Sequence, residues 1–218
     1  GSEMCIRDSD IEALVSETVD MGNLACDMIE KSVQAIVDGN VELADEVIDD
    51  FARMDRYDVE IEDAAIRILT LYQPTASDTR TIATILKSIT YLERIGKYSY
   101  NIATATKYLS EKPMFEPVHL IQPVGEVAVR MVKIVTKAFD EKTVEGLDKI
   151  SEMDDFLDKT MREDLIKIVD FINENEQSAD VCTYYISVIK YLERVGDHAC
   201  KMAEKVNFMV TGMRARIE

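Results

Sequence analysis

The chain has 218 residues, of which 47% are hydrophobic, and its formal net charge is −17 at pH 7. A chain of this length and composition can bury a sizeable core, either as one domain or as two halves of about 100 residues. The negative charge argues against a nucleic-acid-binding protein, which needs a basic face, and against electrostatic docking on an anionic membrane.

The chain contains only 8 Gly and 4 Pro, so few of its residues would interrupt a helix, and it contains no Trp. The turn residues of a β-sandwich or barrel are therefore missing, and long helices are predicted. No apolar run approaches the roughly 18 to 20 residues of a membrane span, so we expect membrane association only through partners. The four cysteines lack CxxC spacing, which indicates reduced thiols of a cytoplasmic protein.

The first half of the chain predicts three helices, because apolar residues recur at helical spacing over long stretches. Their expected ranges are 10–38, 41–72 and, after Pro74, up to about 110. Residues 1–9 show no periodicity and begin with Gly-Ser, as a cleaved tag does, so we expect a disordered tag remnant there. Gly39 is the stop signal of the first helix, and Ser77 and Asp78 are suited to cap the third.

The second half repeats this plan after a joint that contains three prolines, between Lys112 and Pro123. Its helices are expected from about 118 or 123 to 139, over 144–173 and over 179–211. We therefore expect an all-α fold of two tandem three-helix bundles, at residues 10–111 and 117–212.

The clearest sign of duplication is a phrase that occurs twice, 100 residues apart. Residues 91–96 read YLERIG and residues 191–196 read YLERVG. The same register relates Asp55 to Asp155, Ile66 to Ile166 and Ala103 to Ala203. The two halves are therefore copies of one ancestral unit, and corresponding positions can be compared directly.

Acidic residues interrupt the apolar rows of the fifth and sixth helices. Asp154 and Asp158 are four residues apart and share one helix face, and Glu193 and Asp197 repeat this spacing on the next helix. Burial of even one unpaired carboxylate costs several kcal/mol, so the four need cations among them, either Lys and Arg side chains or a metal. The donors are all oxygen, which favours a hard cation such as Mg, Ca, Mn or Fe over zinc.

The corresponding positions of the first half are Met54, Asp58, Glu93 and Lys97. Met54 and Lys97 each replace one carboxylate of a pair, so the ammonium group of Lys97 stands beside the remaining carboxylates. We therefore predict a metal site in the second half and a degenerate, salt-bridged substitute made of Asp58, Glu93 and Lys97 in the first. No Gly-rich phosphate loop, nucleophile elbow or HExxH motif is present, so we predict no catalytic residue and do not expect an enzyme.

The repeated phrase resembles the signature of the PhoU family of phosphate-signalling proteins. The matching segments are YLERIG with Asn101 to Ala103, YLERVGDHACKMAE at 191–204 and QPTASDTR at 73–80. The resemblance implies a cytoplasmic, non-enzymatic negative regulator of phosphate uptake, which mediates between a phosphate ABC transporter and its sensor histidine kinase. It also implies metal clusters on paired E(D)xxxD motifs, matched here by Asp154 with Asp158 and Glu193 with Asp197. We further expect a homodimer.

Three other functions stay open at this point. A PhoU-like protein can instead regulate a sodium-phosphate or low-affinity phosphate transporter. A carboxylate site between helices can also belong to a di-iron oxidase, but that class uses Glu-x-x-His pairs, which His119 and His198 do not form. The third is a metal-free helical oligomerisation scaffold whose acidic clusters are only salt-bridged.

Overall fold

The computed structural model describes residues 1–217, which form long helices joined by short connections. The elements in order are α1 (Ser2–Asp38), α2 (Val41–Leu71), α3 (Ala76–Leu109), η1 (Glu116–Leu120), α4 (Ile121–Glu141), α5 (Asp148–Glu174), η2 (Glu176–Ser178) and α6 (Ala179–Thr211). The prediction of an all-α fold with six long helices is confirmed. Among these helices of residues 1–217, none is long and apolar enough to cross a membrane.

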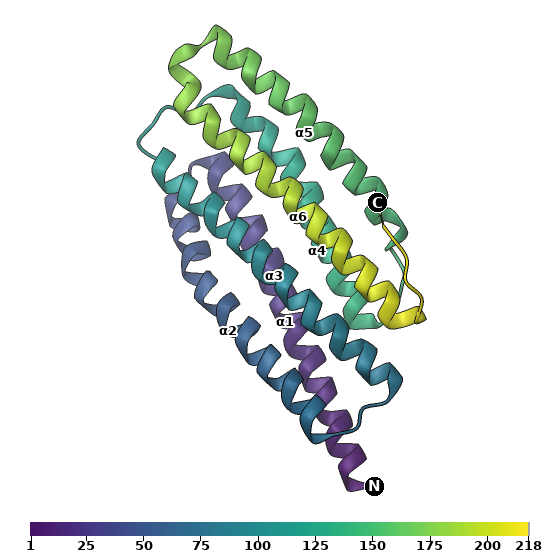
Figure 1. The fold of residues 1–218 in the computed structure, drawn as a ribbon. Coiled ribbons are helices and arrows are strands. Elements are labelled where there is room, and N and C mark those ends of the chain that lie inside the picture. Colours follow the sequence, from purple (N-terminus) through teal and green to yellow (C-terminus); the bar gives the residue numbers. More distant parts are fainter. Residues whose placement is uncertain (218) are drawn as a thin grey trace.

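Each half of the chain forms a bundle of three helices, and the two bundles pack against each other (Figure 1). The centre consists of α1, α3, α4 and α6, because α1 contacts α4 and α3 contacts α6 across the two halves. The outer helix α2 packs on α1 and α3, and the outer helix α5 packs on α4 and α6. Each outer helix therefore reaches the core from one edge of the molecule.

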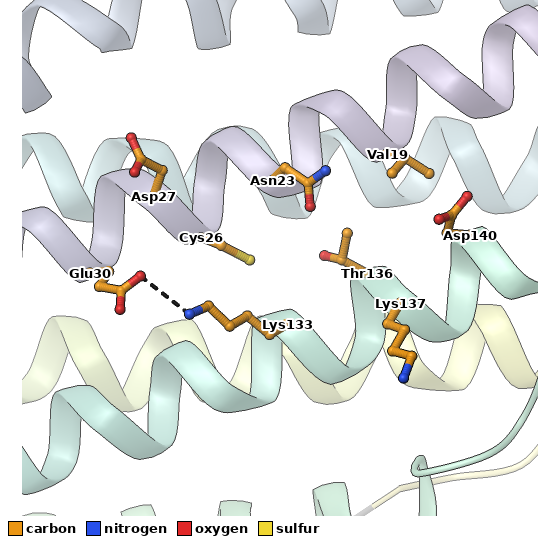
Figure 2. A pocket seen from close by; sticks show the side chains of 9 residues that line it. All are labelled: Val19, Asn23, Cys26, Asp27, Glu30, Lys133, Thr136, Lys137 and Asp140. Carbon is orange, nitrogen blue, oxygen red and sulfur yellow. Dashed lines mark hydrogen bonds and ion pairs between the residues drawn. The ribbon is translucent and has the colours of Figure 1, made fainter.

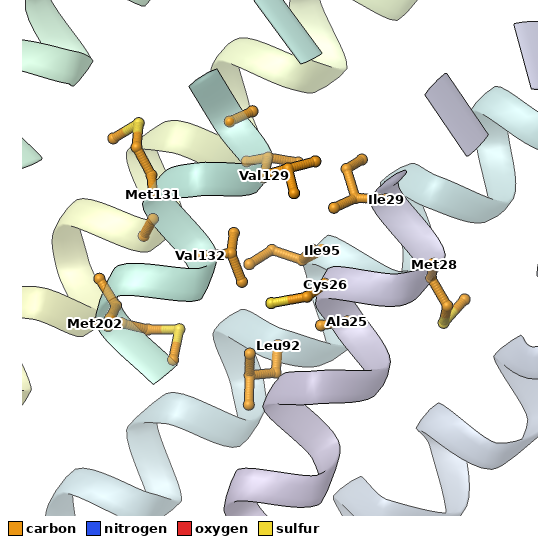
Figure 3. Close-up of a cluster of buried hydrophobic side chains, with 14 of the residues drawn as sticks. Ala25, Cys26, Met28, Ile29, Leu92, Ile95, Val129, Met131, Val132 and Met202 are labelled. Atoms are coloured by element: carbon orange, nitrogen blue, oxygen red, sulfur yellow. The ribbon is translucent and has the colours of Figure 1, made fainter. Parts of the chain in front are cut away.

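The two halves share one hydrophobic core. Cys26 of α1, Leu92 and Ile95 of α3, and Val132 of α4 are buried in a single cluster, which Figure 3 shows from close by. Full burial of a side chain such as Leu or Ile contributes about 1.5 to 3 kcal/mol, so contacts between the halves stabilise the whole molecule and not only its parts.

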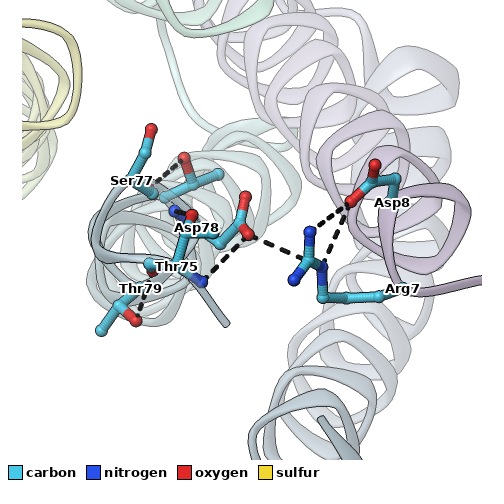
Figure 4. Close-up of polar contacts among 7 residues, drawn as sticks. Arg7, Asp8, Thr75, Ser77, Asp78 and Thr79 are labelled. Atoms are coloured by element: carbon cyan, nitrogen blue, oxygen red, sulfur yellow. Dashed lines mark hydrogen bonds and ion pairs between the residues drawn. The ribbon is translucent and has the colours of Figure 1, made fainter. Parts of the chain in front are cut away.

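The ends of the helices follow local signals. Gly39 ends α1 in the left-handed conformation, at φ 67°, and its N–H reaches the Ala35 carbonyl, so the predicted stop is confirmed. α3 begins with a capping box, in which the Thr75 hydroxyl accepts from the Asp78 N–H and the Asp78 carboxylate accepts from the Thr75 N–H, both at 3.2 Å (Figure 4). Asp78 is thus a capping residue as predicted, but the N-cap is Thr75 and not Ser77, which already lies in the first turn.

The start of α1 differs from the sequence prediction. The helix begins at Ser2, whereas a disordered segment was expected over residues 1–9. Residues 2–9 contain no Gly or Pro, so the helix extends through them without interruption. Arg7 anchors this turn, because its guanidinium lies 3.0 Å from the Asp8 carboxylate and 3.7 Å from that of Asp78 (Figure 4). The other side chains of the segment are exposed, which explains why no apolar periodicity marks it.

The joint between the halves is packed rather than loose. The Phe115 N–H donates to the Tyr185 hydroxyl of α6 at 3.3 Å, and Pro123 lies in the first turn of α4, where a proline costs no hydrogen bond. α5 begins four residues later than the expected start at residue 144, because Gly146 takes a left-handed turn at φ 86°.

Candidate metal centre

The approach of α5 to α6 depends on Gly196, which lies between the two acidic residues of α6. A Cβ built on this glycine would lie 2.4 Å from Leu157 Cδ1 of α5 and 3.4 Å from Met131 Sδ of α4. Only glycine lets the Leu157 side chain pack this closely on the α6 backbone, and this packing offsets the cost of about 1 kcal/mol that a glycine has in mid-helix. The acidic face of α6 is therefore held close to α5.

The four carboxylates predicted from the second half form one half-buried cluster between α5 and α6. Burial raises the pKa of Glu193 to about 7, and a hydrogen bond with Asp158 and the charges of Asp158, Asp197 and Asp154 add to this shift. Burial and the neighbouring Asp158 also raise the pKa of Asp154. At a pKa of about 7 the carboxyl group of Glu193 still carries much of its proton near neutral pH.

Asp154 contributes an oxygen atom without a partner. Its Oδ1 is buried and accepts no hydrogen bond within the described residues. The Cys200 thiol hydrogen-bonds to the same carboxylate, and burial together with Asp154 raises the pKa of this thiol. A buried carboxylate oxygen without a donor is costly, and a cation beside it removes that cost.

The sequence prediction did not include Cys200 in the site. This residue lies three positions after Asp197 on the same helix face, so its spacing placed it near the cluster. It is one of four cysteines that are all free thiols in the structure.

Asp197 lies on the solvent side of the cluster. Its side chain is 48% exposed and pairs with Lys201, one turn further along α6, at 3.2 Å. An exposed pair of this kind contributes only about 0.3 to 0.5 kcal/mol, so Lys201 leaves it at little cost. No ion pair within residues 1–217 joins Asp154, Asp158 or Glu193 to a Lys or Arg side chain.

The cluster offers suitable donors but not a finished coordination shell. In the described part of the chain, no three His, Cys, Asp or Glu side chains converge closely enough to hold a metal ion. The chemistry of the donors nevertheless fits a hard cation, because Asp154 has an unpartnered buried oxygen and Glu193 has a raised pKa and so retains a proton that a cation would displace. Such an ion would supply positive charge, and these residues would hold it.

The corresponding place in the first half is closed by apolar contact. Met54, the counterpart of Asp154, is fully buried, and a Cβ on Gly96 would lie 2.8 Å from its Cγ. Burial, followed by the charges of nearby acidic residues, raises the pKa of Asp58 and of Glu93. The charge of Asp58 is among the causes of the raised pKa of Glu93, and the two further carboxylates of the second half have no counterpart here, since Met54 and Lys97 stand in their place.

The predicted salt bridge of Lys97 is wrong. Its ammonium group lies over two aromatic rings, 5.3 Å from the centroid of Phe51 and 4.8 Å from that of Tyr100. No ion pair connects it with Asp58 or Glu93 in residues 1–217. Aromatic faces attract ammonium groups, and these two rings draw Lys97 away from the carboxylates. Its charge still lowers the pKa of Glu93, but less than burial raises it.

His198 belongs to the interface between the halves and not to the acidic cluster. It is 5% exposed, and its ring stacks on Tyr91 and Tyr98 of α3 at centroid distances of 5.6 and 5.8 Å. Burial lowers its pKa to about 4, so the ring is neutral at physiological pH. Its place one residue after Asp197 turns it about 100° from the face of that carboxylate.

Both halves of the chain match known proteins. The family model described as the PhoU domain matches residues 18–106 and again 121–206. Among curated proteins, the chain is 29% identical to the phosphate-specific transport system accessory protein PhoU homolog of Clostridium acetobutylicum, over 95% of both chains. It is 31% identical to PhoU homolog 1 of Thermotoga maritima, over 93% of this chain and 88% of the relative. The crystal structure of PhoU from Pseudomonas aeruginosa superposes with a TM-score of 0.91 at 27% identity, over 94% of this chain and 99% of that one.

Proposed function

Because the chain belongs to the PhoU family, we propose that it is an accessory protein of phosphate transport that lowers phosphate uptake when phosphate is plentiful. The main support is the match of both halves to the family model. The curated relatives have nearly the same length, and their names give them an accessory role in the phosphate-specific transport system.

In this proposal the protein works by binding and not by catalysis. It acts in the cytoplasm, where it contacts the phosphate ABC transporter and passes the phosphate state to a sensor histidine kinase. A member of the same family could serve a sodium-phosphate or low-affinity transporter instead, and the experiment below separates an effect on uptake from an effect on the kinase by two readouts.

The experiment uses a bacterial strain that lacks its own PhoU protein but keeps the phosphate ABC transporter, the kinase and a reporter gene for phosphate starvation. Expression of this chain in phosphate-rich medium is expected to lower the uptake of radiolabelled phosphate and to repress the reporter. A chain that neither lowers uptake nor represses the reporter would overturn the proposal. Lower uptake with an unchanged reporter would support a transporter partner and contradict the link to the kinase.

The control for this experiment is Gly196→Leu, in a chain that is otherwise unchanged. A leucine at this position would collide with Leu157, because even a Cβ alone would lie only 2.4 Å from Leu157 Cδ1. The variant is expected to lose both effects because α5 cannot pack on α6. Western blotting shows whether the two proteins are present in equal amount.

We also propose that the second half holds a hard cation of the Mg, Ca, Mn or Fe type between Asp154, Asp158, Glu193 and Asp197. The support comes from the all-oxygen donor set, the unpartnered Asp154 Oδ1 and the raised pKa of Glu193 among the other carboxylates. In this role the cation neutralises the cluster and holds the outer helix α5 against α6.

A further inference from the structure

The helices α3 and α6 pack against each other and run in opposite directions. Because the two helices are related by the 100-residue repeat, the two ends of the interface between them are built from corresponding positions. At one end Tyr108 of α3 stacks on Tyr184 of α6 with ring centroids 4.7 Å apart, and Lys112 lies over the Tyr108 ring at 5.0 Å. At the other end the Thr84 hydroxyl of α3 donates to the Lys205 carbonyl of α6 at 3.2 Å. The 100-residue repeat makes Thr84 the counterpart of Tyr184.

The second end lacks the ring that closes the first. Phe208 is the counterpart of Tyr108, but it faces Thr84 where Tyr108 faces the ring of Tyr184. A groove of about 800 Å³ opens here and is lined by both Thr84 and Phe208. Small-molecule sites typically have volumes of roughly 300 to 1,000 Å³. The groove thus has the size of a ligand site, and its aromatic side wall is in place.

The groove is basic although the protein is strongly acidic. Its lining includes Lys87 of α3, Lys205 of α6, and Arg214 and Arg216 of the segment after α6, with Glu204 as the one acidic residue among the described residues of the lining. The whole chain has 25 Lys and Arg against 42 Asp and Glu, so this grouping reverses the charge locally. Converging positive charge of this kind attracts anions.

The equivalent end of the interface lacks these two lysines, and its basic side chain over the Tyr108 ring is Lys112. The counterparts of Lys87 and Lys205 are Ser187 and Ala105, both uncharged. The lysines are therefore not part of the common architecture of the two halves. The two lysines occur at the end where Thr84 replaces the tyrosine ring of Tyr184. The missing ring leaves room for a ligand, and the lysines favour an anionic one.

The segment after α6 forms one wall of the groove. Gly212 ends α6 in the left-handed conformation, at φ 72°, and the chain then turns back, as Figure 1 shows at the C-terminal end. The Ile217 N–H donates to Glu204 Oε1 at 3.0 Å, and the Arg214 guanidinium lies 5.2 Å from the centroid of the Phe208 ring. These contacts hold the returning segment along α6 and place its arginines at the groove.

We propose that this groove binds a nucleoside phosphate. The base lies against the ring of Phe208, in the place that Tyr184 occupies at the other end, and the phosphate groups contact Lys87, Lys205 and the guanidinium groups of the returning segment. A flat ring suits an aromatic wall, and guanidinium groups suit phosphate because they donate two parallel hydrogen bonds. None of the four carboxylates of the candidate metal centre lines the groove, so the inference does not rest on the proposed function.

The first experiment is calorimetric titration of the full chain with ATP, adenosine and inorganic phosphate as separate probes. One ATP is expected to bind per chain, at least tenfold more tightly than either adenosine or phosphate alone, and more weakly as salt increases. No binding at millimolar ATP would overturn the proposal. Phosphate that binds as tightly as ATP would overturn the assignment of a base-binding wall.

The second experiment compares two double variants that each remove two lysines. Lys87→Ala with Lys205→Ala is expected to weaken ATP binding at least tenfold. The matched control is Lys133→Ala with Lys137→Ala, in a groove of about 500 Å³ between α1 and α4 (Figure 2). Lys133 pairs there with Glu30 at 3.2 Å. This control is expected to bind ATP as the wild type does, and equal losses in both variants would show unspecific attraction and overturn the site.

Two further variants test the aromatic wall. Phe208→Leu keeps an apolar side chain without the ring. It is expected to weaken ATP binding about tenfold while leaving phosphate binding unchanged, since only the base stacks on the aromatic ring. Thr84→Tyr places a ring where Tyr184 has one and is expected to abolish ATP binding. Circular dichroism confirms that each variant is folded, and ATP affinity equal to the wild type in folded Phe208→Leu would overturn the role of the ring.

Discussion

The carboxyl group of Glu193 in α6 lies against that of Asp158 in α5, and burial together with this neighbour raises the pKa of Glu193 to about 7. At this pKa Glu193 keeps much of its proton up to neutral pH, which limits the repulsion between the two side chains. When both groups ionise they repel each other across the contact between the outer helix and the centre. The attachment of α5 therefore responds to pH and to any cation that replaces the proton.

The stability of the metal-free protein is expected to fall as pH rises from about 4.5 to 7. Glu193 has a pKa near 4.5 when unfolded and about 7 in the folded protein, so in this window the folded state binds the additional proton and loses it as pH rises. The loss is on the order of 1 kcal/mol, less than the shift alone implies, because the half-exposed cluster is screened by solvent. Urea unfolding at pH 5 and pH 8, with a chelator present, measures the difference.

A matched pair of variants shows whether Glu193 causes this pH dependence. Glu193→Gln removes the titrating group and is expected to reduce the fall in stability, although not to zero, because the pKa of Asp154 is raised as well. Glu152→Gln removes an exposed acid of α5 and is expected to leave the fall unchanged. Identical pH profiles for the wild type and Glu193→Gln would contradict the assignment.

Metal content is expected to depend on the second half alone. Asp158→Asn with Asp197→Asn removes two oxygen-donor charges from the complete cluster and should abolish bound metal. Asp58→Asn with Glu93→Gln makes the same change of charge in the first half and should leave metal content at the wild-type level. Elemental analysis after incubation with Mg, Ca, Mn and Fe salts gives the comparison, and a wild-type protein that retains none of these ions would show a metal-free cluster.

Gly196→Ala is expected to destabilise the protein although alanine favours helices. The new Cβ would lie 2.4 Å from Leu157 Cδ1, so Leu157 must leave its place against α6. The strain of 1 to 3 kcal/mol, typical of overpacking, exceeds the gain of about 1 kcal/mol in helix propensity, and we expect a net loss of about 1 kcal/mol. Thermal unfolding measures this change.

The first half provides the control for this substitution. Gly96→Ala meets the Cγ of Met54 at 2.8 Å, but methionine is unbranched and adapts more easily than leucine. Its effect on the melting temperature should be smaller than that of Gly196→Ala. Equal melting temperatures for Gly196→Ala and the wild type would show that Leu157 moves at no cost.

The helices were predictable because their buried faces recur in the sequence. The range 179–211 of α6 agrees at both ends, and the half-buried carboxylate pairs lie on the faces that their spacing indicates. The first turns of α1 were not predictable from periodicity, because the segment before Asp10 is largely exposed and carries no apolar signal. Its attachment through Arg7 to Asp78 joins residues that are far apart in the sequence.

The contacts of individual charged groups were less predictable than the helices. Spacing places Lys97 four residues after Glu93, which indicates an ion pair. The structure places the ammonium over Phe51 of another helix, a tertiary contact that helical spacing does not contain. The same reason explains why the hydrogen bond of Cys200 to Asp154 was missed, since it joins α6 to α5.

The comparison of the two halves predicts that a site like the one proposed for the second half can be built in the first. Met54→Asp with Lys97→Asp installs the carboxylates that stand at Asp154 and Asp197 in the other half. Met54 is fully buried, and loss of such a side chain costs about 2 to 5 kcal/mol, so the metal-free variant should melt at a lower temperature. Added metal should then recover part of this loss, because a ligand that binds only the folded state stabilises it.

The measurements for this double variant are metal content per chain and melting temperature with and without metal. Twice the wild-type metal content is expected, since the first half would then present Asp58, Glu93 and two new carboxylates. Met54→Leu with Lys97→Gln removes the same methionine and ammonium without adding oxygen donors, and it should keep the wild-type metal content. A folded Asp variant with unchanged metal content would show that the four carboxylates are insufficient, and that a neighbour such as Cys200, replaced in the first half by Tyr100, is also required.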